Sequence, residues 1–167
     1  MGFLLRQIRK SKWYAHKDVP WLGEGNIQAD ALADLKTEDN ALSVWFIEGD
    51  KTNLEDVVAA LAAGRDVIAN FDYALIDESL VTEIGIKVTA TPGEVGDPRV
   101  RIWHRDLAEL SGGKLYGLAL AISKHGEKQR VLPDTVTDLV RRAVASGGIR
   151  LADLKPEIAS RIQGTAP

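Results

Sequence analysis

The run from Arg99 to Asp106 holds the residues whose types and spacing most suggest chemistry. If residues 99–103 form a strand, Arg99, Arg101 and Trp103 point to one side, because successive side chains of a strand alternate between its faces. Guanidinium groups pair well with carboxylate and phosphate oxygens. These three residues are therefore the candidates for binding an anionic group. An ordinary solvent face, paired with the acidic middle segment, is the simpler expectation, because strand faces are commonly charged.

His104 and Asp106 are two positions apart, so on a strand they share a face. A histidine oriented by a carboxylate is half of a general-base arrangement, and it makes a small hydrolase one hypothesis for the function. A nucleophile is not indicated, because no candidate serine stands in the Gly-x-Ser-x-Gly turn of many hydrolases. The serines considered are Ser43, Ser79, Ser111, Ser123, Ser146 and Ser160.

The sequence does not favour a metal or phosphate site. The chain has no cysteine, and its three histidines, His16, His104 and His125, are scattered rather than paired at helical spacing. The segment 111–114 opens a predicted helix with two glycines and Lys114. It lacks the first glycine and the final Ser or Thr of a phosphate-binding loop. We expect no metal and no cofactor.

Charge is distributed unevenly along the chain, although the net charge is only −3. Residues 1–17 carry +5, residues 18–97 carry −13, and residues 98–167 carry +5. Mutual neutralisation on folding is the simpler expectation, because mixed surfaces are the norm. An acidic face that attracts a basic partner is the alternative.

The acidic middle segment argues against nucleic acid as the main ligand, since that affinity depends on neutralising many phosphates. A nucleic-acid-binding protein is nevertheless kept as a further hypothesis. It would use Arg99, Arg101 and the basic N-terminal segment, in which Trp13 and Tyr14 could contact bases.

Hydrophobic periodicity and turn residues predict a mixture of strands and helices. Strands are expected at 3–8, 41–48, 86–90 and 99–103. Helices are expected at 27–35, 52–64, 77–85 and 112–124, from Pro133 onward, and as two short pieces meeting at Lys155. Thr52 and Glu55 have the spacing of a capping box at the start of the second helix. Residues 67–76 fit either a strand or a helix.

This order of elements predicts an α+β fold, in which C-terminal helices cover a small, mostly antiparallel sheet. The length favours a single domain over residues 1–167. The alternative is a boundary near residues 91–98, a loop with two prolines and two glycines.

The leading functional hypothesis is a protein-interaction module that acts by binding another protein, as an accessory, regulatory or inhibitor-like protein of the antitoxin or immunity type. We expect a binding protein rather than an enzyme, because no complete catalytic motif is present. The N-terminal run Phe3–Leu5 is too short for a signal peptide, and no segment reaches the roughly 18 to 20 apolar residues of a membrane span. The expected location is therefore the cytoplasm.

Overall fold

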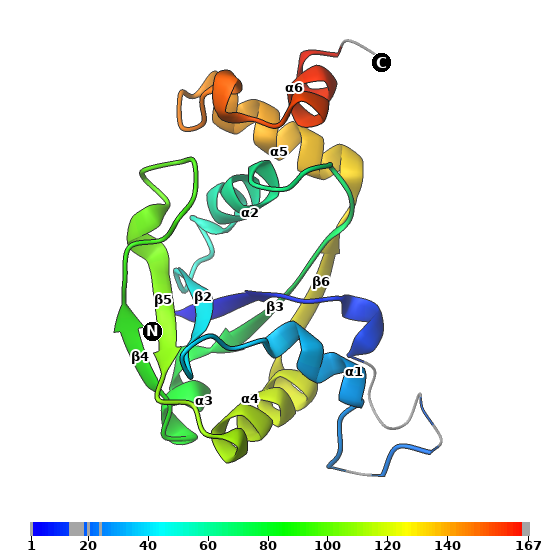
Figure 1. Cartoon of the computed structure of the whole chain (residues 1–167), viewed down its shortest axis with the longest axis vertical. Helices are drawn as coiled ribbons and strands as arrows, with labels where there is room; N and C mark the ends of the chain where they lie inside the picture. The colour runs from blue at the N-terminus through cyan, green and yellow to red at the C-terminus, as the bar shows by residue number, and fades with distance from the viewer. Residues whose placement is uncertain (1, 14–18, 20, 24, 165–167) are drawn as a thin grey trace.

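The protein has an α+β fold in which an antiparallel sheet lies between two layers of helices (Figure 1). The computed structural model describes residues 2–13, 19, 21–23 and 25–164. In this part of the chain six strands form one sheet in the order β4-β5-β2-β1-β3-β6. The strands are β1 (Phe3–Gln7), β2 (Leu42–Ile47), β3 (Phe71–Asp77), β4 (Lys87–Ala90), β5 (His104–Ala108) and β6 (Glu127–Val131). Every neighbouring pair is antiparallel, which confirms the predicted fold class.

The helices divide between the two faces of the sheet. Figure 1 shows α2, α5 and α6 on one side and α1, α3 and α4 on the other. The C-terminal helices α4, α5 and α6 thus cover the sheet as predicted, and the earlier helices α1, α2 and α3 complete the two layers. The bounds are α1 (Ala29–Leu32), α2 (Leu54–Ala63), α3 (Glu78–Glu83), α4 (Gly112–His125), α5 (Pro133–Ala145) and α6 (Pro156–Gln163).

Each face of the sheet belongs to its own hydrophobic cluster. Leu5, Ile47 and Leu75 pack with α2, α5 and α6, whereas Leu4 and Val44 pack with α1, α3 and α4. Because the central strands are covered on both faces, they need apolar residues at nearly every position. This explains the continuous apolar run predicted as a strand at 41–48, and it settles residues 71–77 as a strand.

Local capping sets several helix boundaries where the sequence predicts them. Asp77 accepts a 2.8 Å hydrogen bond from the backbone N–H of Ser79 and begins α3. Gly85, at φ +78°, follows the end of that helix. Pro133 stands in the first turn of α5, where its missing N–H costs nothing. Lys155 is the N-cap of α6, as expected from Pro156.

The predicted capping box at Thr52 is wrong. The N-cap of α2 is Asn53, and its side chain is used elsewhere: it accepts from the Glu48 N–H at 2.9 Å and donates to the Phe46 carbonyl at 3.1 Å. The Thr52 hydroxyl bonds to the carboxylates of Glu48 and Asp50. The tight connection from β2 thus occupies the side chains that would have capped the helix.

The predicted strand at 99–103 is also wrong. Residues Arg101–Trp103 form a 3-10 turn (η4), and the strand β5 begins only at His104. The buried Asp97 carboxylate accepts the Arg99 backbone N–H at 2.9 Å, which bends the chain before the strand. Arg99, Arg101 and Trp103 therefore do not share a strand face.

The expectation of a single domain stays a prediction. Strands β4 and β5, which precede and follow residues 91–98, are hydrogen-bonded neighbours in the sheet. Among the described residues, no helix combines the length and apolar character needed to cross a membrane.

Candidate functional site

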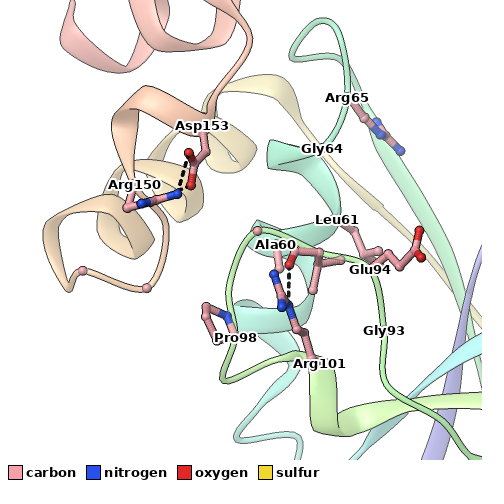
Figure 2. Close-up of a pocket in the computed structure, with 14 residues that line it drawn as sticks. Ala60, Leu61, Gly64, Arg65, Gly93, Glu94, Pro98, Arg101, Arg150 and Asp153 are labelled. Atoms are coloured by element: carbon pink, nitrogen blue, oxygen red, sulfur yellow. Dashed lines mark hydrogen bonds and ion pairs between the residues drawn. The ribbon is translucent and has the colours of Figure 1, made fainter.

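An open cleft of about 850 Å³ lies where three segments meet (Figure 2). One wall is the C-terminal end of α2, the second is the loop of residues 93–98 with Arg101, and the third is the turn of residues 147–153. Much of the lining is small or apolar, which leaves room for a ligand backbone to approach. The lining residues of this kind are Ala60, Leu61, Gly64, Gly93, Val95, Gly96, Pro98, Gly147 and Gly148.

Three arginines and two acidic residues complete the lining of the cleft. Arg150 is already neutralised, because its guanidinium donates to both oxygens of Asp153 at 2.8 and 3.0 Å. Figure 2 shows this pair on one side of the cleft and Arg101 between α2 and the loop of residues 93–98. Arg65 and Glu94 also belong to the lining.

Arg101 is exposed and has only a backbone partner among the described residues. Its Nε donates to the Val95 carbonyl at 2.9 Å, a bond across the loop that holds the side chain over the cleft. No described carboxylate forms an ion pair with it. A guanidinium has five N–H donors, so the terminal nitrogens of Arg101 remain free to bind an acceptor from outside.

Arg65 is held in place in a similar way. Its Nη1 donates to the Asn70 carbonyl at 3.0 Å, and the guanidinium lies 4.5 Å from the centre of the Phe71 ring. Burial lowers the pKa of Arg65 from its ordinary value, while the charge of Asp72 opposes this change. Within the described part of the chain Arg65 forms no ion pair. A partly desolvated, unpaired cation gains more from binding an anion than a fully hydrated one does.

Ion pairs elsewhere join the acidic middle of the chain to both basic flanks. Such pairs neutralise charge locally, in keeping with the expectation that the charged segments neutralise one another on folding. Most other arginines have a carboxylate partner of this kind, whereas Arg65 and Arg101 have none among the described residues. The pairs are Arg9–Asp34, Lys12–Asp30, Arg130–Asp72, Arg99–Asp97 and Arg142–Glu55.

The three residues predicted to bind an anion have separate surroundings. Arg99 donates to both carboxylate oxygens of the buried Asp97, so it serves the structure of the loop. Trp103 is half-buried against the core cluster of α2 and α5. Only Arg101 lines the cleft. Arg65 belongs to no motif in the sequence, and its one local signal is its place directly after Gly64, the C-cap of α2.

His104 and Asp106 do share a face of β5, and a threonine joins them. The Thr91 hydroxyl lies 2.8 Å from His104 Nδ1 and donates to Asp106 Oδ2 at 2.9 Å. Ser43, on the neighbouring strand, donates to the other Asp106 oxygen at 3.4 Å. The Trp45 ring contacts the His104 ring edge-on, with 5.0 Å between the centroids.

This network lies behind the cleft wall rather than in the cleft. The His104 side chain is 12% exposed, and His104 is not among the residues that line the cleft. Gly93 separates the two, because it faces the cleft and also packs on Trp45 and His104. The hydrolase hypothesis therefore has a histidine, a carboxylate and hydroxyls in contact, and it stays a prediction.

No described group of three histidine or acidic side chains is arranged to hold a metal ion. Tyr14 and His16, considered above, lie outside the described residues. Comparisons of the chain with family models, with curated proteins and with solved structures found no match.

Proposed function

We propose that this protein is an interaction module that binds an acidic segment of another protein in the cleft between α2, the loop of residues 93–98 and the turn of residues 147–153. The observation that carries the proposal is the pair of arginines in the cleft, Arg65 and Arg101, each held by backbone carbonyls and neither paired with a described carboxylate. Prepositioned guanidinium groups lose little conformational freedom when they bind carboxylates.

The shape of the cleft supports an extended segment rather than a compact small molecule. The cleft is open, and at two of its lining glycines, Gly96 and Gly147, nothing lies within 4 Å of the place a Cβ would take, so a peptide backbone can approach closely there. Small-molecule sites are usually concave and enclose most of the ligand surface.

The charge of the lining favours a protein over a nucleic acid. Glu94 also lines the cleft, and its carboxylate, which forms no ion pair with a described residue, would repel a continuous polyphosphate, whereas Asp153 is paired with Arg150. A protein segment can place acidic residues against the arginines and neutral residues against the carboxylates.

Fluorescence anisotropy with a labelled peptide of alternating glutamate and alanine tests the proposal. We expect binding that weakens as salt is added, and that weakens by about tenfold or more in an Arg65→Gln, Arg101→Gln double variant. Lys124→Gln is the control, since Lys124 is an exposed cation on α4, in the other helical layer.

Three results would overturn the proposed function. The first is equal affinity of the double variant and the Lys124→Gln control for the acidic peptide, and the second is no binding by the unaltered protein even at low salt. The third is tighter binding of a single-stranded oligonucleotide than of the peptide, with loss in the double variant. That outcome would assign the cleft to nucleic acid.

A further inference from the structure

The loop that forms one wall of the cleft is fastened to the sheet at Thr91 and Gly93. Gly93 donates its N–H to the Arg101 carbonyl at 3.1 Å, and Arg101 Nε donates to the Val95 carbonyl at 2.9 Å. A Cβ on Gly93 would overlap the Trp45 ring and the His104 Cβ, so the loop backbone lies directly on these side chains. The position of Arg101 therefore depends on how this base of the loop is held.

The Thr91 hydroxyl has one proton and so donates one of its two hydrogen bonds and accepts the other. An ionised carboxylate can only accept, so the single hydroxyl proton of Thr91 is donated to Asp106 Oδ2. Thr91 Oγ1 lies 2.8 Å from His104 Nδ1 and must then accept a hydrogen bond from the Nδ1–H group. The chain of bonds runs from His104 Nδ1–H to Thr91 Oγ1–H to Asp106.

We propose that Thr91 is a positioning residue for the cleft: its hydroxyl holds neutral His104 in the Nδ1–H tautomer and fastens the loop of residues 93–98, with Arg101, to β5. The consequence for ligand binding rests on the proposed function, whereas the tautomer and the order of the loop do not. His104 Nε2 is then left without its proton, 4.0 Å from Asp106 Oδ1.

The strand offers a matched control at Thr89. Thr89 is directly opposite Asp106 in the β4–β5 pair and is half-buried, as Thr91 is. Its hydroxyl has no hydrogen-bond partner among the described residues. Thr91→Val and Thr89→Val thus remove the same atoms from the same face of the sheet, and only the first removes the bridge to His104. Thr91→Ser keeps the hydroxyl and should restore the behaviour of the unaltered protein.

Three measurements test the proposal together. Nitrogen-15 NMR of the His104 imidazole, at a pH where the ring is neutral, should show the Nδ1–H tautomer in the unaltered protein, in Thr91→Ser and in Thr89→Val. Thr91→Val should change it to the Nε2–H tautomer. Amide hydrogen exchange at Gly93 should become about tenfold faster or more in Thr91→Val alone. Affinity for the labelled Glu–Ala peptide should fall in the same variant.

An Nε2–H tautomer in the unaltered protein would overturn the proposal, and this measurement does not require any variant to fold. The proposal would also be overturned if a folded Thr91→Val variant kept the His104 tautomer and the Gly93 amide exchange rate of the unaltered protein. If the unaltered protein shows no peptide binding but the NMR and exchange results are as expected, the proposed function fails and the role of Thr91 in holding the loop stands.

Discussion

The carboxylate of Asp97 and the guanidinium of Arg99 form a bidentate pair, with Nη2–Oδ2 at 2.7 Å and Nε–Oδ1 at 3.1 Å. The Asp97 side chain is only 2% exposed, and the pair lies directly against Gly148. Two walls of the cleft therefore meet at this ion pair, which fixes the loop of residues 93–98 against the turn that follows α5.

Gly148 allows this contact because it has no side chain. In Gly148→Ala, the new Cβ would overlap Arg99 Nη2 and Asp97 Oδ2 and would separate the pair, in which Asp97 is buried and Arg99 is half exposed. We expect a loss of about 2 kcal/mol in the free energy of unfolding, measured by urea denaturation, because the buried Asp97 carboxylate would lose charged hydrogen bonds.

Gly147→Ala is the control for that substitution. Gly147 has φ +74° and open space at its Cβ position, so alanine there meets only backbone strain. The expected cost is about 1 kcal/mol. Equal destabilisation by the two alanines would contradict the assigned role of the Asp97–Arg99 pair.

Acid should destabilise the fold through Asp72 and Asp97. A side-chain hydrogen bond from Arg130 lowers the pKa of Asp72 below its ordinary value of 3.8. Burial alone would raise the pKa of Asp97, but hydrogen bonds from the Arg99 side chain and backbone outweigh it and lower that pKa as well. Below about pH 3.8 the unfolded chain then binds more protons than the folded one. The stabilisation is complete above this pH and is lost as the pH falls through the folded-state values.

Urea denaturation between neutral pH and pH 3 checks this dependence. The unaltered protein should lose free energy of unfolding mainly at the acid end, and the Asp72→Asn variant should be less stable at neutral pH but less sensitive to acid. Parallel pH profiles for the two proteins would show that Asp72 does not contribute.

The inward face of α2 can be tested with a pair of alanine variants. Val58 is 2% exposed in the core cluster, whereas Leu61 is half-buried and lines the cleft. Val58→Ala should lower the free energy of unfolding by about 2 kcal/mol through lost burial and a new cavity, and Leu61→Ala by about 1 kcal/mol. Thermal unfolding of both variants provides the comparison. A larger effect at Leu61 would contradict the orientation of the helix.

Elements with strong local signals could be predicted from the sequence. The apolar run of β2 is a signal carried by its own residues, and the cap at Asp77 and the first-turn prolines of α5 and α6 rest on interactions within a few residues. Strand β6 was not predicted, because its charged sequence has no apolar alternation and its ion-pair and hydrogen-bond partners lie in other elements. Arg130 reaches across to Asp72, and the Lys128 ammonium donates to carbonyls at the end of α4.

The candidate site could be predicted only in part, because its geometry depends on distant segments. The spacing of His104 and Asp106 was enough to place them on one face, but nothing local indicated that Thr91 would join them. Arg101 was singled out for the wrong reason, since the predicted strand is a 3-10 turn. Arg65 is brought to the cleft by the packing of α2 against α5, which residue spacing alone does not reveal.

NMR of the arginine side chains shows directly whether Arg65 and Arg101 bind the acidic peptide. The Nε–Hε signals of each arginine can be followed while the Glu–Ala peptide is added at low salt. We expect the signals of Arg65 and Arg101 to shift and saturate together, while those of Arg99 and Arg141, both held by carboxylates, change little. Saturable shifts confined to other arginines, or no shift at any peptide concentration, would show that Arg65 and Arg101 do not bind the peptide.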